Sequence, residues 1–263
     1  MQKVRLALTI AGSDPTGGAG IQVDLKTFSA FGLYGFSVLT AITVQNTVGV
    51  KEIFPVPADF VSHQLEALLS LWTFPSSKAG MLTNSSIVES VAEKIKESQI
   101  GKFVLDPVMK AKNGTLLLDE PGQEMLIKKL LPLTWLITPN IEEAKIITGV
   151  EIKNLTTMKK AARVINQMGS KNVLIKGGHL TGKPLDLLFN GKSFRTYEDE
   201  RLPKEMHGTG CAFSAAITAL LAKGESLEKS VEKAKMFVNR AIADSLCLGG
   251  KYSLFQTIRS GIK

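Results

Sequence analysis

The sequence predicts an α/β fold with a mainly parallel sheet flanked by helices. Short apolar runs rich in β-branched residues alternate with longer runs of helical period, and glycine or proline stands at the joints between them. This alternation is typical of a parallel sheet covered by helices. No internal repeat, low-complexity tract or linker divides the 263 residues, so we interpret residues 1–263 as one domain.

The elements are expected in the following order. Six strands are predicted at Val4–Ile10, Ser37–Val44, Lys78–Met81, Phe103–Asp106, Trp135–Thr138 and Val173–Lys176. Helices are predicted at Gly20–Phe31, Asp59–Leu71, Ser85–Glu97, Gly122–Leu131, Ile141–Thr148 and Met158–Met168. The last third adds short strands at Leu185–Phe189 and Ser193–Tyr197 and then three helices. Ligands of such sheets bind beyond the carboxyl ends of the strands, so residues there are candidates for function.

Composition and charge exclude several classes of protein. With 44% hydrophobic and 21% charged residues, the chain can build a large core. Its purely apolar runs are far shorter than the ~20 residues of a membrane span. The net charge of +8 is scattered along helical stretches, which favours solvated helix faces over a nucleic-acid stripe and leaves phosphorylated small molecules as partners. Cys211 and Cys247 stand far apart without metal or disulfide spacing, so we expect a reducing, cytoplasmic location.

A glycine-rich loop, residues 11–20, follows the first strand and opens a helix. Its four glycines allow backbone N–H groups to approach a ligand closely. The loop has neither the ending of a P-loop nor the spacing of a dinucleotide fingerprint. The residues alone therefore leave two interpretations open, a ligand-binding loop or a tight turn without ligand.

A second glycine-rich segment, His207-Gly208-Thr209-Gly210-Cys211, enters a predicted helix. Consecutive N–H groups at Gly208, Thr209 and Gly210, together with the helix dipole, form an anion hole. Cys211 lies in the first turn, where we expect the thiolate to be favoured. The alternative is a buried, inert cysteine beside a glycine turn.

Further polar side chains stand where predicted strands end. Asp106, Glu143 and Lys176 combine carboxylates with a lysine, which suits magnesium–nucleotide chemistry. Asn140 stands three residues before Glu143, so the two could instead form a helix capping box. Gln45 ends a long apolar strand, and its amide suits either the edge of a heterocycle or a backbone clamp.

At these residues the chain resembles the hydroxymethylpyrimidine (phosphate) kinase family of the ribokinase superfamily. The resemblance is carried by Ala11-Gly-Ser-Asp14, Gly17-Gly-Ala-Gly-Ile-Gln22, Gln45-Asn46-Thr47, Asp106-Pro-Val-Met109, Thr138-Pro-Asn140 with Glu143, Lys176-Gly-Gly-His179, and His207 to Cys211. It implies a three-layer α/β/α ribokinase-like fold. It also implies phosphoryl transfer from ATP, with Mg²⁺, to 4-amino-5-hydroxymethyl-2-methylpyrimidine and then to its monophosphate, for thiamin biosynthesis. A homodimer is the family's usual assembly.

The resemblance also assigns residues to the pyrimidine pocket. Gln45 would hold the aminopyrimidine edge and Met81 would pack on the ring, while Gly12, Ala19 and Asp24 would line the walls. Pro15-Thr16 departs from the serine-rich pair that is usual in this loop.

On the nucleotide side the resemblance assigns the remaining roles. Asn140 and Glu143 would organise magnesium, and Asp106, Lys176 and Lys235 would serve the phosphates. Gly208, Thr209 and Gly210 would form the anion hole, with Cys211 where most kinases of the superfamily have an aspartate base.

Two other functions remain open from the sequence. A pyridoxal or pyridoxine kinase would phosphorylate a similar hydroxymethyl group beside a ring nitrogen. A non-catalytic relative would bind the pyrimidine without ATP turnover, and Glu143, Lys176 and the Gly208–Cys211 segment argue against it.

Overall fold

A nine-stranded sheet forms the centre of the protein in a computed structural model that describes residues 4–177, 185–198, 206–248 and 251–253. The strand order is β3-β2-β1-β4-β5-β6-β7-β8-β9. β2, β1 and β4 to β7 run parallel, whereas β3 at one edge and β8 and β9 at the other pair antiparallel. The strands are β1 (Leu6–Ser13), β2 (Tyr34–Asn46), β3 (Gly49–Pro55), β4 (Ser76–Ala79), β5 (Lys102–Leu105), β6 (Leu136–Ile137), β7 (Asn172–Ile175), β8 (Leu185–Phe189) and β9 (Phe194–Glu198).

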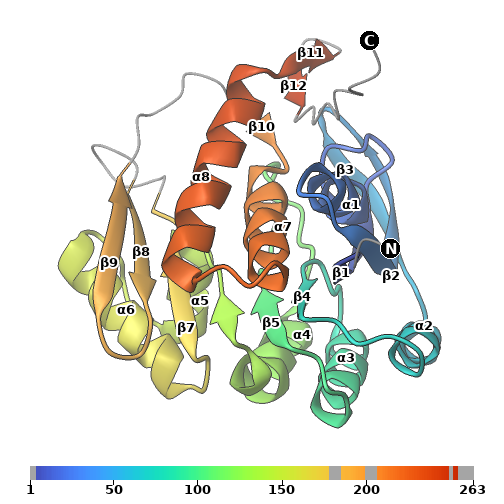
Figure 1. The fold of residues 1–263 in the computed structure, drawn as a ribbon, viewed down its shortest axis with the longest axis horizontal. Helices are drawn as coiled ribbons and strands as arrows, with labels where there is room; N and C mark the ends of the chain where they lie inside the picture. Colours follow the sequence, from blue (N-terminus) through green and yellow to red (C-terminus); the bar gives the residue numbers. More distant parts are fainter. Residues whose placement is uncertain (1–3, 178–184, 199–205, 249–250, 254–263) are drawn as a thin grey trace.

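Helices cover both faces of this sheet and make three layers (Figure 1). One layer holds α1 (Gly20–Ala30), α7 (Thr209–Ala222) and α8 (Leu227–Ala243). The other holds α2 (Ala58–Leu69), α3 (Ser85–Glu97), α4 (Glu120–Met125), α5 (Ile141–Thr148) and α6 (Leu155–Gln167). The three-layer α/β/α prediction is confirmed.

The core lies on both sides of the sheet because the central strands are apolar on both faces. Val104 of β5, Leu136 of β6 and Leu174 of β7 pack toward α7 and α8. Their neighbours Phe103 and Leu105 pack on the opposite side, with α3. Successive side chains of a strand point to opposite faces, so a sheet buried on both sides needs continuous apolar runs.

Helix α7 is buried along nearly its whole length, from Ala212 to Ala222. It packs against α1, α8 and strands of the sheet, and a helix that is apolar all round is typical of such a position. This burial fixes the amino end of α7, which carries the second glycine-rich segment.

Several element boundaries differ from prediction. The edge strand β3 was not predicted, because Lys51 and Glu52 make its sequence resemble a polar loop. The helix predicted at 122–131 begins earlier and is α-helical only to Met125, after which a π-helical turn and a short 3₁₀ turn lead to Pro132 and Leu133. Proline cannot continue the α-helical hydrogen bonds, which accounts for the break.

The C-terminal part also differs from the three helices predicted there. In the described residues, α7 and α8 are followed by strands β11 (Leu246–Leu248) and β12 (Lys251–Ser253). These two strands form a small sheet of order β10-β12-β11 with β10 (Met206–His207). The small sheet lies beyond the amino end of α7, at the top of Figure 1. The motif residue His179 lies outside the described residues.

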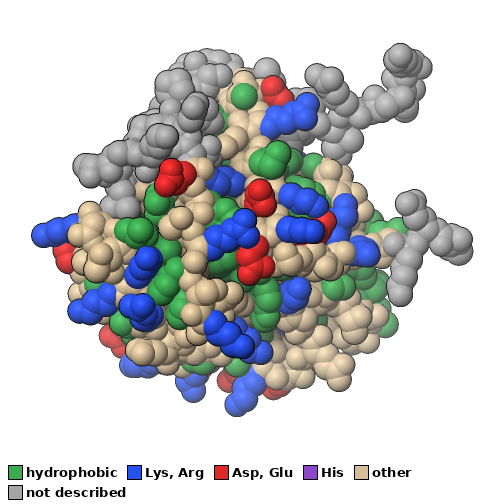
Figure 2. All heavy atoms as spheres, turned by 60° about the vertical axis from the view of Figure 1, so that its left-hand side comes forward, with side chains coloured by type: hydrophobic (Ala, Val, Ile, Leu, Met, Phe, Trp, Pro, Cys, Tyr) green, Lys and Arg blue, Asp and Glu red, His purple; other side chains and the backbone are tan. Residues whose placement is uncertain are grey.

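Figure 2 shows lysine and arginine side chains spread over one face of the molecule with acidic side chains among them, rather than gathered in one stripe. The absence of a nucleic-acid partner stays a prediction. Within the parts of the chain that the structure describes, none of the helices combines the length and the apolar character that crossing a bilayer requires.

Candidate active site

A cavity of about 210 Å³ opens at the carboxyl ends of β1, β2, β4 and β5. It is bordered by the glycine-rich loop after β1, the loop after β5, and the amino ends of α5 and α7. Its walls include most of the residues predicted from the sequence: Gly12, Ala19, Gln45, Met81, Asp106, Asn140, Glu143, Lys176, Gly208, Thr209, Gly210 and Cys211. Asp24 and Lys235 are not among its walls. The roles of these residues remain predictions.

The glycines of the first loop are required by close packing. Gly20 has φ +59°, and a Cβ there would lie 2.3 Å from the carbonyl oxygen of Gly12. A Cβ on Gly12 would lie 2.9 Å from Sδ of Met81. The loop therefore turns tightly and also lines the cavity, and ligand binding by the loop stays a prediction.

Gln45 belongs to a polar network at one end of the cavity. Its Nε2 is placed 2.8 Å from Nε2 of His207, which also lies 3.1 Å from Oδ2 of Asp14. Asp14 accepts further hydrogen bonds from the backbone N–H and hydroxyl of Thr16. Burial would raise the pKa of Asp14, but the hydrogen bonds from His207 and Thr16 outweigh it and hold the pKa below its usual value. His207 and Asp14 were not predicted as site residues, although both stand inside the glycine-rich motifs.

The prediction that Asp24 lines the pyrimidine pocket is wrong. Asp24 is fully buried behind the cavity, where Oδ1 accepts a hydrogen bond from Nζ of Lys78 at 2.7 Å and Oδ2 accepts one from the hydroxyl of Thr9 at 2.6 Å. A buried carboxylate needs such partners. Lys78, whose side chain is also fully buried, borders the cavity instead and had no signal in the sequence beyond its place in a strand.

Asp106 and Lys176 form an ion pair at the other end of the cavity, with Nζ 2.8 Å from Oδ1. Thr138 and Ser214 donate hydrogen bonds to the same carboxylate. Burial opposes the charge on both partners, but their mutual attraction outweighs it, so the pKa of Asp106 is lowered and that of Lys176 is raised. Both groups are therefore charged at neutral pH.

Glu143 lies close to this ion pair. Burial raises its pKa to about 7, with Asp106 adding to the rise and Lys176 opposing it. One excess carboxylate beside a buried ion pair is an arrangement that a bound cation would stabilise.

Asn140 borders the cavity and also caps helix α5. Its Oδ1 accepts the backbone N–H of Glu143 at 2.8 Å, and Oε2 of Glu143 accepts the N–H of Asn140 at 2.8 Å. This is a complete capping box at the start of α5, so the capping interpretation is confirmed. Because Mg²⁺ is commonly held through water, the carboxylate of Glu143 fits such an ion, whereas Oδ1 of Asn140 is already engaged.

Lys235 pairs with Asp186 rather than lining the cavity. Its Nζ lies 2.6 Å from Oδ2 of Asp186, whose other oxygen accepts the backbone N–H of Gly177. The contact links α8 to β8 and to the end of β7. The predicted contact of Lys235 with the nucleotide phosphates stays a prediction.

The amino end of α7, where the sequence predicts an anion hole, borders the cavity through Gly208, Thr209 and Gly210, and the anion hole itself stays a prediction. Gly208 has φ +76°, and a Cβ there would lie 1.7 Å from the carbonyl oxygen of Gly18, so only glycine fits. The expectation of a favoured thiolate at Cys211 is wrong. Burial raises its pKa to about 11, an effect that the charge of Lys78 only partly opposes.

Comparison with known proteins identifies the family. Residues 14–255 match the family model described as phosphomethylpyrimidine kinase. The chain belongs to this family. A hydroxymethylpyrimidine/phosphomethylpyrimidine kinase of Haemophilus influenzae is 45% identical over 255 residues, which is 95% of both chains. That of Aquifex aeolicus is 43% identical over 251 residues, 95% of this chain and 98% of the relative.

Solved structures agree. The phosphomethylpyrimidine kinase of Clostridium difficile is 43% identical, with a TM-score of 0.83 over 91% of this chain and 100% of that chain. The pyridoxal kinase of Staphylococcus aureus in complex with AMP-PCP and pyridoxal is 35% identical, with a TM-score of 0.87 over 99% of this chain and 96% of that chain. The predicted family, the ribokinase-like fold and kinase activity are confirmed.

The loop after β5 lies over the cavity of this kinase. Side chains of Asn113 and Thr115 donate hydrogen bonds to the carbonyl oxygen of Val50 in β3. Lys110 and Lys112 of the same loop border the cavity. This contact between distant segments could not be predicted from the sequence, because β3 itself was not predicted.

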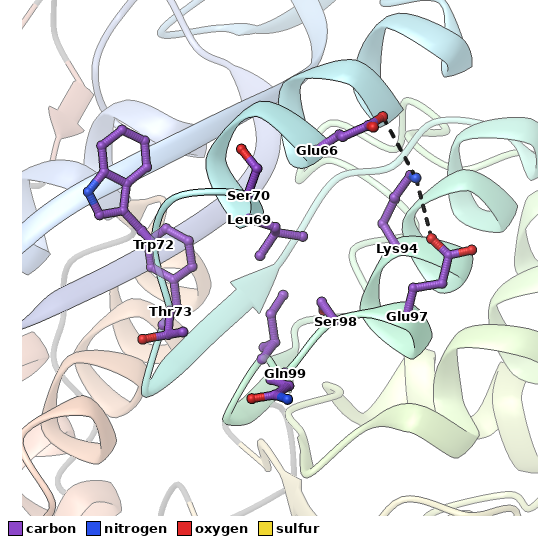
Figure 3. Close-up of a pocket in the computed structure, with 11 residues that line it drawn as sticks. Glu66, Leu69, Ser70, Trp72, Thr73, Lys94, Glu97, Ser98 and Gln99 are labelled. Carbon is purple, nitrogen blue, oxygen red and sulfur yellow. Dashed lines mark hydrogen bonds and ion pairs between the residues drawn. The ribbon is translucent and has the colours of Figure 1, made fainter.

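A second hollow of about 350 Å³ lies at the amino ends of β4 and β5 (Figure 3). Its walls include Trp72 and Leu69, and Lys94 pairs there with Glu97 at 3.3 Å and with Glu66 at 3.9 Å. It contains none of the predicted site residues. Ligands of parallel sheets bind at the opposite ends of the strands, so we place the active site in the smaller cavity.

Proposed function

We propose that this protein transfers the γ-phosphoryl group of ATP first to 4-amino-5-hydroxymethyl-2-methylpyrimidine and then to its monophosphate. The observation that carries the proposal is one cavity with an amide, Gln45, at one end and the glycine-rich amino end of α7 beside the Asp106–Lys176 pair at the other. The names of the bacterial relatives support this substrate, and a relative from Geobacter sulfurreducens is named as a bifunctional thiamine biosynthesis protein.

In the proposed complex, Gln45 pairs with the ring edge while Met81 packs against the ring. The hydroxymethyl group then points toward Cys211 and the amino end of α7. Phosphoryl transfer depends mainly on positioning and on neutralising charge. The N–H groups of residues 208–210 and the ammonium of Lys176 supply that charge at the transferred group.

Magnesium belongs to the same proposal. Glu143 would hold the ion through water, and bound Mg²⁺ supplies charge neutralisation and orientation of the ATP phosphates. The backbone N–H of Asn140, which donates to Oε2 of Glu143, would hold that carboxylate in place. Asp106 keeps Lys176 directed into the cavity.

Cys211 is the proposed proton acceptor of the first reaction. Because burial raises the pKa of the thiol to about 11, Cys211 must first release its own proton to solvent, and only the small thiolate fraction then accepts the proton of the hydroxymethyl group. We therefore place proton transfer late, after much of the bond to the leaving group has broken. In the second reaction the nucleophile is a phosphate oxygen, which needs no base.

A pyridoxal kinase activity is the second candidate, because pyridoxal kinases of Staphylococcus aureus share the fold at TM-scores up to 0.88. The test is incubation with Mg-ATP and hydroxymethylpyrimidine, with pyridoxal in a parallel reaction, followed by mass spectrometry. Stepwise formation of the pyrimidine mono- and diphosphate supports the proposal. Phosphorylation of pyridoxal alone, or no turnover, would reject it in favour of the pyridoxal kinase or a non-catalytic binding protein.

The β2–β3 hairpin carries an apolar surface that bears on the assembly of the protein. Ile42, Val44 and Phe54 are at least half exposed on the edge hairpin β2–β3, where Ile42 stands opposite Phe54. An exposed apolar edge of this kind favours burial against another protein surface. We propose that a second copy of the chain packs on it. Light scattering should give the mass of a dimer for the wild type and of a monomer for Phe54→Glu. We also propose that residues 1–263 form one domain. We propose a cytoplasmic location, because the cytoplasm supplies ATP.

A further inference from the structure

His207 lies between two groups that make incompatible demands on a single nitrogen atom. Its Nε2 is 3.1 Å from Oδ2 of Asp14 and 2.8 Å from Nε2 of Gln45. Asp14 is 3% exposed and carries a lowered pKa, so its oxygen only accepts hydrogen bonds. An amide nitrogen only donates. One imidazole nitrogen cannot donate to the first and accept from the second at once.

Rotation of the Gln45 amide by 180° removes the conflict. Amide oxygen and nitrogen atoms are assigned by their hydrogen bonds, because their shapes are nearly identical. After the rotation, Nε2–H of His207 donates to both Asp14 and Oε1 of Gln45. The amide N–H then faces Thr43, whose hydroxyl lies 3.3 Å from the other end of the amide.

Thr43 can accept that hydrogen bond. Its own hydroxyl hydrogen is engaged with the carbonyl oxygen of Ser13 at 2.8 Å, which leaves the oxygen lone pairs free to face an N–H donor. Without the rotation, Oε1 of Gln45 faces Thr43, and the single hydroxyl hydrogen of Thr43 would have to be donated both to Oε1 and to the carbonyl oxygen of Ser13. Both ends of the amide therefore favour the rotated orientation.

We propose that His207, held by Asp14, fixes the Gln45 amide with its oxygen toward the imidazole, and thereby determines which heterocycle edge the pocket accepts. The inference rests on the proposed function, since it concerns the same pyrimidine pocket. It assigns His207 as a positioning residue that acts through Gln45.

The fixed amide discriminates between ligands. One lone pair of Oε1 and one N–H of Nε2 point outward, in a fixed order. A ring nitrogen beside an exocyclic amine presents the complementary acceptor and donor. A 4-oxo ring presents a ring N–H and a carbonyl oxygen, which is the reverse order, and would leave two polar groups unpaired.

The backbone keeps His207 in this position. A Cβ on Gly18 would lie 3.2 Å from Cδ2 of His207, and Gly208 packs directly on the carbonyl oxygen of Gly18. The loop that carries Asp14 and the strand that carries His207 are thus in contact through two glycines. His207 belongs to β10, so the small sheet is coupled to the pyrimidine end of the cavity.

The first test needs no ligand. Nitrogen NMR of the three histidines, with His207 identified by its loss in His207→Gln, should show a protonated Nε2 in the wild type. A neutral ring with its proton on Nδ1 would overturn the proposal, because such a ring cannot donate to Asp14.

The second test compares binding of 4-amino-5-hydroxymethyl-2-methylpyrimidine with that of its 4-oxo counterpart by calorimetry. The wild type should favour the amino compound by about 10- to 100-fold, the effect of unpaired buried polar groups. In His207→Ala the amide is free to rotate, so the ratio should fall to within about threefold. His207→Gln, which keeps an N–H donor, should retain most of the preference, and the exposed His63→Ala should leave it unchanged.

The outcomes separate the two proposals. Equal weakening of both ligands in His207→Ala, with the ratio kept, would mean a structural role only and would overturn the inference while the proposed substrate stands. A wild type that binds neither compound would overturn the proposed function and the inference together, whatever the NMR result.

Discussion

Two lysine–aspartate pairs near the cavity have almost the same N–O distance, but only the second has both of its residues in the cavity wall. Lys78 and Asp24 are 2.7 Å apart with both side chains fully buried, whereas Lys176 and Asp106 are 2.8 Å apart with 19% of the Lys176 side chain exposed. The first pair closes on itself behind the cavity wall. The second reaches into the cavity, so we expect the first pair to stabilise the fold and the second to contact a ligand.

The two pairs also differ in the charged groups that surround them. Burial raises the pKa of Asp24, with Lys78 and Thr9 opposing that rise, whereas the carboxylates around Lys78 raise the pKa of Lys78 despite its burial. Beside Lys176 there are two carboxylates, Asp106 and Glu143. That end of the cavity therefore has a lysine and a carboxylate of the kinds that the proposed reaction needs for a phosphate and a cation.

Breaking the buried pair should give the largest loss of stability. Lys78→Met leaves Asp24 buried without its partner, and such changes cost about 3–5 kcal/mol. Urea unfolding measures the loss. The double variant Asp24→Leu with Lys78→Met should recover most of it, because an apolar pair of similar volume avoids the unpaired charge. A Lys78→Met protein as stable as the wild type would show that the ion pair does not stabilise the fold beside the cavity.

Breaking the exposed pair should instead affect catalysis. Lys176→Met is expected to lower kcat/KM by about 10²–10³-fold, typical for loss of one preorganised charge at the transferred group, with a smaller change in stability. Lys145→Met, which removes an exposed ion pair with Glu151, is the matched control and should change neither. Lys235→Met should cost far less than Lys176→Met, and equal losses would restore the nucleotide role first predicted for Lys235.

Cys211 lies between the two pairs. The pKa of its thiol shows whether burial or the nearby charges have the larger effect there. Because its pKa is raised to about 11, the thiol is protonated at neutral pH, and at pH 8 roughly a thousandth is thiolate. Alkylation by iodoacetamide should therefore rise about tenfold per pH unit from pH 8 to 10. A rate that levels off below pH 8 would show that α7 and Lys78 prevail over burial.

The same residue separates the two proposed reactions. Cys211→Ala should lower kcat of the first phosphorylation more than that of the second, since only the alcohol must lose a proton during the reaction. Both rates come from single-substrate assays with the pyrimidine and with its monophosphate. Equal losses in the two assays would contradict a role in proton transfer.

The comparison of the pairs also shows what the sequence can predict. Asp106 and Lys176 could be predicted because both follow apolar runs of the parallel sheet, and ligands bind beyond the carboxyl ends of such strands. This rule could not show that Asp24, one helix turn inside α1, points away from the cavity toward Lys78. Likewise the helix-end rule placed Cys211 correctly but ignored burial, which decides its pKa. Contacts between distant segments, such as His207 with Asp14, are set by packing that no local pattern contains.

The smallest effect is expected at the α5 capping box, where variants of Asn140 and Glu143 should behave differently. Asn140→Ala removes an N-cap hydrogen bond and should cost about 1 kcal/mol of stability, measured by urea unfolding. Because Oδ1 of Asn140 is engaged with Glu143, kcat at saturating magnesium should change little. Glu143→Gln keeps the shape of the side chain but removes the charge proposed for Mg²⁺, so it should raise the magnesium concentration needed for half-maximal rate. If Asn140→Ala raises that concentration as much as Glu143→Gln does, Asn140 binds the ion and the cap is secondary.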